Sequence, residues 1–218
     1  MADVILVRHG ATEWSASGRH TSVTDLPLTP AGEVGARAAG RWLAGRRVGA
    51  VLTSPRRRAR ETCALAGLGG PARVDDDLAE WRYGEYEGLT TARIREDRPG
   101  WSIWSDGAPG GESPEEVGRR ADRVVGRVRD LLGRDGGDVA LFSHGHFLRV
   151  LATRWVELEV AWGRALMLDA GAVCLLGFER ETPALRLWNL RPTAPGGAGA
   201  PPGEEPGRRG PGGLGPEP

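Results

Sequence analysis

An arginine, a histidine and a glycine, Arg8, His9 and Gly10, directly follow an apolar run at residues 4–7. A guanidinium stays charged and its forked donors match phosphate oxygens, so Arg8 indicates an anion site. An imidazole can act as a base, a ligand or a nucleophile, and glycine lets the backbone pass close to a ligand. On its own, the triplet is more typical of a strand that ends in an ordinary surface Arg–His pair.

The same arrangement, an apolar run followed by polar groups, occurs twice more along the chain. Residues 48–52 lead to Ser54 and an arginine-rich stretch at 56–60, and residues 138–143 lead to His144. The carboxyl ends of parallel strands share one edge of a sheet, where α/β proteins bind their ligands. We therefore expect these groups to converge on one pocket, with arginines and helix N-termini holding an anion.

Apolar runs alternate with amphipathic stretches along most of the sequence, which predicts strands alternating with helices. Such a chain folds as a three-layer α/β/α sandwich around a mostly parallel sheet. The last two strands are expected to form a closing pair at one sheet edge. The polar segment 13–27 and the segment 78–88 are predicted to be ordered loops, and the segment 101–111 is predicted to be a lid or loop. We predict strands at 4–8, 48–52, 72–74, 138–143, 173–178 and 184–190, and helices at 30–45, from 56 onward, 91–98, 114–133 and 147–156.

Length and composition restrict the class of protein. The chain has 218 residues, no lysine and a formal net charge of zero, which favours neither a nucleic-acid partner nor a membrane surface. Two cysteines, Cys63 and Cys174, lie in apolar elements, as in a reduced cytoplasmic protein. No signal peptide or membrane span is predicted.

We expect one domain at 1–192 and a disordered tail at 193–218, where 16 of 26 residues are Gly or Pro. Edge strands and surface tryptophans are compatible with a homodimer.

Two histidines, two arginines and a carboxylate around one point are suited to phosphoryl transfer. The arginines would neutralise the phosphoryl oxygens, one imidazole would attack phosphorus, and a second, protonated imidazole would stabilise the transition state. A carboxylic acid such as Glu80 would protonate the leaving oxygen. These arguments do not choose between His9 and His144 as the nucleophile, nor among the arginines at 56–60.

Five sequence blocks, in order, resemble the histidine phosphatase superfamily, the phosphoglycerate-mutase-like group. The resemblance runs from Val4 to about Leu190, so it implies that residues 1–192 form a histidine phosphatase catalytic domain with the phosphoglycerate-mutase-like fold. Any one block is a weak signal, but five with the right spacing are a strong one. The blocks are Arg8-His9-Gly10, Ser54 with Arg58-Ala59-Arg60-Glu61-Thr62, Glu80 with Gly84-Glu85-Tyr86-Glu87-Gly88, Gly111-Glu112-Ser113, and Ser143-His144-Gly145.

The resemblance implies a role for each matching residue. It makes His9 the phosphorylated nucleophile, Arg8 and Arg58 the phosphate clamps, His144 the electrostatic partner and Glu80 the proton donor. Further phosphate or substrate contacts are expected from Ser15, Thr21, Ser22, Trp81, Arg82, Tyr83 and Gly145.

The superfamily contains phosphatases and mutases, and the sequence favours a phosphatase. Mutases of the group usually carry a lysine after the acid block, where this chain reads Gly88-Leu89-Thr90-Thr91, and an asparagine where it has Ser15. These departures remove groups that a second phosphate would need. The segments at 18–21, 24–29 and 80–84 look most like those of the acid phosphatases and the sedoheptulose-bisphosphatase-like sugar phosphatases. The expected substrate is a small phosphorylated metabolite, such as a sugar phosphate or a phosphoglycerate-like compound, and the alternative is a cofactor-dependent phosphoglycerate mutase.

Two other interpretations are less favoured. His144 and His146 at a strand end resemble a metal-ligand pair, but such sites need further ligands and the chain has only four histidines. We therefore expect neither a metal nor a cofactor. A non-catalytic module that binds phosphorylated ligands would require the loss of a catalytic group, and none is missing.

Overall fold

A six-stranded sheet forms the centre of the protein. The computed structural model describes residues 2–135 and 137–193. The strand order is β3-β2-β4-β1-β5-β6. The first four strands along the chain run parallel, whereas β5 pairs antiparallel with β1, and β6 pairs antiparallel with β5. The bounds are β1 Val4–Arg8, β2 Val48–Thr53, β3 Arg73–Val74, β4 Asp138–Ser143, β5 Val173–Glu179 and β6 Thr182–Leu190.

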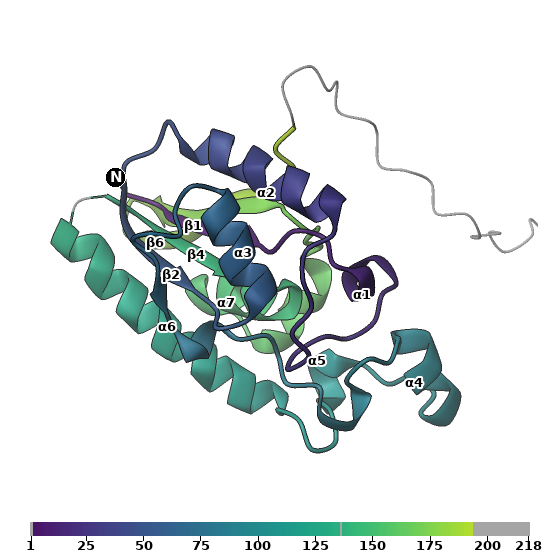
Figure 1. Cartoon of the computed structure of the whole chain (residues 1–218). Coiled ribbons are helices and arrows are strands. Elements are labelled where there is room, and N and C mark those ends of the chain that lie inside the picture. Colours follow the sequence, from purple (N-terminus) through teal and green to yellow (C-terminus); the bar gives the residue numbers. More distant parts are fainter. Residues whose placement is uncertain (1, 136, 194–218) are drawn as a thin grey trace, which may run out of the picture.

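Helices cover both faces of this sheet, with α2 and α3 on one side and α6 and α7 on the other (Figure 1). Several begin with the capping residues that the sequence supplies; for example, the Thr29 hydroxyl accepts a hydrogen bond from the backbone of Gly32, and Pro30 opens α2. The helices are α1 Glu13–Ala16, α2 Pro30–Leu43, α3 Arg57–Leu65, α4 Thr91–Asp97, α5 Ile103–Asp106, α6 Pro114–Asp135 and α7 Gly145–Trp155, with short 3-10 helices at Asp76–Leu78, Gly84–Tyr86 and Val160–Ala165.

The side chains of β1 alternate between two hydrophobic cores. Val4 and Leu6 pack into the core shared with α6 and α7, and Ile5 and Val7 pack into the core shared with α2 and α3. All four are buried because successive side chains of a strand point to opposite faces of a sheet that is covered on both sides. This is the expected three-layer α/β/α architecture.

The register of β1 against β4 brings two predicted site residues together. Arg8 lies opposite Ser143, and the backbone N–H of His9 donates a hydrogen bond to the Ser143 carbonyl at 2.9 Å. His9 and His144 therefore leave neighbouring parallel strands at the same level, at the carboxyl edge of the sheet.

Three local features differ from the sequence prediction. The predicted loop at 13–27 contains α1, because Thr12 and Ser15 form a capping box. Segment 101–111 contains the short helix α5. Helix α7 begins at Gly145, two residues before the predicted start. No helix among the described residues is both long and apolar enough to span a membrane, and the predicted tail lies outside these residues except for Thr193.

Candidate active site

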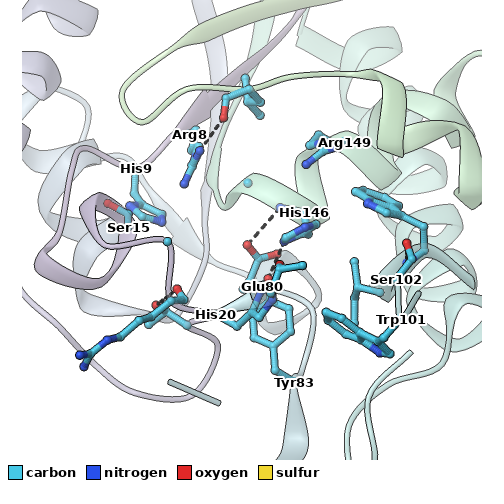
Figure 2. A pocket seen from close by; sticks show the side chains of 18 of the residues that line it. Arg8, His9, Ser15, His20, Glu80, Tyr83, Trp101, Ser102, His146 and Arg149 are labelled. Atoms are coloured by element: carbon cyan, nitrogen blue, oxygen red, sulfur yellow. Dashed lines mark hydrogen bonds between the residues drawn. The ribbon is translucent and has the colours of Figure 1, made fainter. Parts of the chain in front are cut away.

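A cavity of about 330 Å³ opens at the carboxyl edge of the sheet, beyond β1 and β4 (Figure 2). Arg8, His9, Glu80 and Gly145 form its inner end. The outer part is lined by the loop after α1, by α4, by α5 and by the first turns of α7. This is the position at which parallel α/β sheets bind ligands.

His9 presents one ring nitrogen to the cavity. The Gly10 carbonyl lies 2.8 Å from its Nδ1, and because a carbonyl can only accept, Nδ1 carries the proton and the lone pair is on Nε2. Burial, followed by the charges of Arg58 and Arg8, lowers the pKa of His9 well below its usual range. The imidazole is therefore neutral at physiological pH and able to act as a nucleophile.

Arg8 lies against the first residue of α7. Its guanidinium donates to the Leu168 carbonyl, and its Nε is buried with no hydrogen-bond partner among the described residues. A β-carbon on Gly145 would lie only 3.1 Å from the guanidinium carbon of Arg8. Glycine at this position therefore lets the cation pack close to the N-terminus of α7.

Arg58 projects from the first turn of α3 and is fully buried. Its two terminal nitrogens donate to the backbone carbonyls of Thr21, Ser22 and Thr24. Its Nε is buried without a partner in the described part of the chain. The arginine thus fixes the loop after α1 and keeps one donor free.

His144 lies behind His9, outside the cavity lining. The two rings have centroids 5.1 Å apart in an edge-on arrangement, and His144 Nε2 is 2.7 Å from the Ser54 hydroxyl. Burial, followed by the charge of Arg58, lowers the pKa of His144 well below its usual range. The ligand-free protein therefore holds His144 neutral, whereas the sequence analysis assigned it a proton in the transition state.

Three buried nitrogens around His9 lack hydrogen-bond partners among the described residues: Arg8 Nε, Arg58 Nε and His144 Nδ1. Buried polar groups in native proteins are normally paired, so a group of unpaired ones indicates a ligand site. Burial also lowers the pKa of both arginines, because removal from water disfavours the charged guanidinium. An anion bound beside His9 would neutralise the positive charge of the two arginines and would also pair with the three free nitrogens.

Glu80 is held by the N-terminus of α7. Its Oε1 accepts from the backbone N–H groups of Trp81 and Phe147, at 2.9 and 2.8 Å, and its Oε2 accepts from that of His146 at 3.1 Å. The first N–H groups of a helix have no partners within the helix and favour a negative charge nearby. Glu80 therefore caps the helix that begins next to His144, and its Oε2 retains a free lone pair toward the cavity.

A buried ion pair holds the backbone segment that contains Glu80. The Arg120 guanidinium binds both carboxylate oxygens of Glu112 at 2.7 and 2.8 Å. It also donates to the carbonyls of Asp77, Ala79 and Glu80. Arg120 and Glu112 are only 8% and 7% exposed, so the pair is shielded from water and holds the backbone that carries the acid.

The outer wall of the cavity combines imidazoles with aromatic rings. The Tyr83 hydroxyl lies 2.7 Å from Nδ1 of His146, and the His20 ring lies 4.7 Å from that of Tyr83. Burial lowers the pKa of His20 to about 4 and, together with the Arg149 charge, lowers that of His146 well below its usual range. Trp101 and Trp104 complete this wall. The surface is uncharged at the histidines and offers stacking and hydrogen bonding.

The predicted phosphate and substrate contacts divide into two groups. Ser15, Thr21, Tyr83 and Gly145 line the cavity, although the Ser15 and Thr21 hydroxyls bind backbone carbonyls. Arg58, which is fully buried, and three other residues lie outside the lining. The Ser22 hydroxyl is hydrogen-bonded to Glu87, the Trp81 indole is fully buried and donates to the Glu112 carbonyl, and the Arg82 side chain is exposed.

The sequence analysis did not identify Arg149, Arg95 and Ser102 as site residues, yet all three line the cavity. Arg149 follows Gly145 by four residues on α7, and residues at this spacing share one face of a helix. If the helix had been predicted to begin at Gly145, Arg149 would have been expected on the same helix face as Gly145. Among residues 2–135 and 137–193, no three His, Cys, Asp or Glu side chains are grouped as metal ligands would be.

The fold and the site define a class of protein. Parallel strands that lead to Arg8-His9 and to His144, with Arg58 and Glu80 nearby, are matched by a known family. Residues 4–191 fit the histidine phosphatase superfamily (branch 1). The chain belongs to this superfamily and is an enzyme of the phosphatase class, as the sequence blocks predicted.

Individual relatives are similar over most of the chain. It is 42% identical over 189 residues to an acid phosphatase of Mycobacterium tuberculosis, covering 86% of this chain and 92% of that protein. It is 40% identical over 185 residues to a sedoheptulose 1,7-bisphosphatase of Saccharomyces cerevisiae, covering 72% and 68%. A solved structure of an open reading frame from Mycobacterium tuberculosis superposes with a TM-score of 0.83 at 41% identity, over 88% of this chain and 99% of that one.

Proposed function

We propose that the protein is a metal-independent phosphomonoesterase that acts through a phosphohistidine on His9. The observation that carries this proposal is the state of His9, a neutral imidazole with Nδ1 fixed by the Gly10 carbonyl. Its reactive Nε2 is thereby left beside two arginines that have unpaired donors. A nucleophile and a preformed anion site at one point are what phosphoryl transfer requires.

In the first step, Nε2 of His9 attacks phosphorus, a P–N bond forms and the P–O bond of the ester breaks. Arg8 and Arg58 bind the phosphoryl oxygens, and the incoming anion offsets the burial that keeps His144 neutral, so His144 can gain a proton and stabilise the transition state. Glu80 gives a proton from Oε2 to the leaving oxygen. In the second step, a water molecule loses a proton to Glu80 and attacks phosphorus, which releases inorganic phosphate and free His9.

The substrate class is a small phosphorylated metabolite, in particular a sugar phosphate. The cavity of about 330 Å³ has the size of a small-molecule site, and its aromatic rings and neutral imidazoles suit a polyhydroxylated group. Relatives named as an acid phosphatase and a sedoheptulose 1,7-bisphosphatase support this class.

The covalent step is tested by brief mixing with a ³²P-labelled phosphomonoester followed by a quench. We expect a protein-bound phosphoryl group that is stable in base and labile in acid, and we expect none in His9→Ala. Labelling that persists in His9→Ala would refute the assignment.

Turnover is expected to be unchanged in EDTA. An assay with 3-phosphoglycerate and bisphosphoglycerate tests the mutase alternative, because a mutase would form 2-phosphoglycerate faster than inorganic phosphate.

A further inference from the structure

The Arg8 guanidinium is oriented by a turn that lies directly before β5. Within the described residues, the side chain of Arg8 makes one hydrogen bond, from Nη1 to the Leu168 carbonyl. The same turn holds the backbone of the arginine, because the Arg8 N–H donates to the Ala172 carbonyl at 3.1 Å. Residues 168–172, the β5 turn, therefore set the direction of one of the two arginines at the phosphoryl site.

The β5 turn is held in its place by the side chain of Asn189. The Oδ1 atom of Asn189 accepts a hydrogen bond from the Asp169 N–H at 2.8 Å, and its Nδ2 donates to Oδ2 of Asp169 at 2.9 Å. A backbone N–H can only donate, so the amide oxygen must face it. One amide group thus fixes both the backbone and the side chain of Asp169, which follows Leu168 directly in the chain.

The backbone of β6 explains why this side chain reaches the turn. Asn189 has a φ of 56°, in the left-handed region, which asparagine tolerates better than most residues that have a side chain. The register of the β5–β6 pair shifts between residues 173 and 175 of β5, so that two residues of β6 lie opposite one of β5. This is a β-bulge, a feature that redirects side chains and is frequent next to active sites. The bulge therefore turns Asn189 toward the β5 turn.

The other contacts of this region do not replace the one from Asn189. Arg191 Nε lies 2.7 Å from Oδ2 of Asp169, and this hydrogen bond, together with the one from Asn189, lowers the pKa of Asp169. The Arg191 side chain is largely exposed, and water screens exposed ion pairs. His9 is oriented independently of the turn side chains, because its ring is fixed by the Gly10 carbonyl.

We propose that Asn189 is a positioning residue for phosphoryl transfer, which holds the Arg8 guanidinium through the β5 turn in the direction that binds the phosphoryl oxygens. This inference rests on the proposed function, in which Arg8 binds those oxygens. Arg8 Nε is buried and unpaired among the described residues, so a shift of the Leu168 carbonyl would turn this free donor away from the anion. A misplacement of about 1 Å can cost about 10²-fold in rate.

The first test is Asn189→Gly, which removes both hydrogen bonds to Asp169 and leaves a residue that adopts a positive φ without strain. We expect kcat/KM for p-nitrophenyl phosphate to fall about 10- to 100-fold. The inhibition constant of orthovanadate, an analogue of the phosphoryl group, should rise by a similar factor. Each variant is assayed well below its own Tm, so that unfolding does not contribute to the loss.

A double-variant cycle with Arg8→Ala separates positioning from a general structural role. If Asn189 acts through Arg8, then adding Asn189→Gly to Arg8→Ala should change kcat/KM less than about 3-fold, because the group that it positions is already absent. Slow rates are measured as single-turnover labelling with the ³²P-labelled ester. Equal losses in the two backgrounds, or a loss below about 3-fold in the wild-type background, would overturn the positioning role.

An exchange of the two side chains tests the contact itself. Asn189→Asp keeps the shape and tolerates the same φ, but it places a second carboxylate against Asp169, so we expect a loss at least as large as that of Asn189→Gly. Combining it with Asp169→Asn restores both hydrogen bonds with donor and acceptor exchanged. The combined variant should recover kcat/KM at least about 3-fold over Asn189→Asp alone, and no recovery would overturn the proposal.

The matched control is Arg186→Gln, which breaks another contact of β6, the ion pair with Asp3 at 2.6 Å. We expect no change in kcat/KM or in inhibition by orthovanadate. A loss equal to that of Asn189→Gly would mean that any loosening of β6 has the same effect, which would overturn the specific role of Asn189. A wild type that hydrolyses no phosphomonoester would instead overturn the proposed function.

Discussion

Replacing Glu112 with glutamine tests whether the buried Glu112–Arg120 pair positions Glu80. The substitution removes the negative charge and one of the two acceptor oxygens that bind the guanidinium at 2.7 and 2.8 Å. Arg120 is 8% exposed, so it would be left as a buried cation without a counter-ion. Breaking one partner of such a pair costs about 3 kcal/mol. For a domain of this size, that loss lowers Tm by about 6–12 °C.

The same substitution should also change catalysis in a selective way. Arg120 binds the carbonyls of Asp77, Ala79 and Glu80, so a displaced guanidinium moves the backbone that carries the acid. We expect kcat for glucose 6-phosphate, whose leaving group needs a proton, to fall about 10-fold more than kcat for p-nitrophenyl phosphate, whose leaving group does not.

The matched control is Arg123→Gln, which breaks an exposed ion pair between the same helix and Asp77. Exposed pairs contribute about 0–1 kcal/mol, so Tm should change by at most a few degrees. The reasoning fails if Glu112→Gln lowers Tm no more than this control does. The positioning role fails if Glu112→Gln slows both substrates equally.

Two further predictions concern the site itself. Glu80→Gln should reduce kcat for glucose 6-phosphate about 10²- to 10⁴-fold and that for p-nitrophenyl phosphate much less, because it removes the proton donor; similar losses for the two substrates would argue against this role. Burial lowers the pKa of His20 to about 4, so the unfolded chain binds the proton more readily between pH 6.5 and about 4. His20 then contributes a loss of about 3 kcal/mol of stability as the pH falls through that range. NMR titration of His20 and urea unfolding from pH 7 to 4 measure both effects, and a His20 pKa near 6.5 would contradict the burial argument.

Strands and most helices could be predicted because local sequence determines them. Residues 4–7 are apolar without interruption, as expected for a strand covered on both faces, and Thr29-Pro30 marks the start of α2 with a cap and a fixed φ. The start of α7 could not be predicted in this way. The backbone N–H groups at its N-terminus donate hydrogen bonds to the carboxylate of Glu80, which lies 65 residues before Gly145. No local sequence pattern can indicate a capping residue that is so distant in the chain.

The proximity of Arg8, His9 and His144 was predictable for a different reason. Arg8-His9 and His144 follow strand ends, and parallel strands bring their ends together. The same argument does not predict the positions of Trp81 and Arg82. Both lie in the same irregular segment as Glu80, where no periodicity fixes the direction of a side chain, and the structure turns the indole of Trp81 into the core and leaves Arg82 at the surface. Arg149 was missed because its place in the cavity follows from the true start of α7.

The position of β1 in the sheet determines when the active site can form during folding. Both neighbours of β1, β4 and β5, lie after residue 137, so the strand that carries Arg8 and His9 has no partner until most of the chain is available. Pairings across such sequence separations close late in folding because of their loop entropy. The first half of the chain therefore cannot form a smaller working enzyme, and the appearance of catalytic turnover during refolding would mark completion of the central sheet.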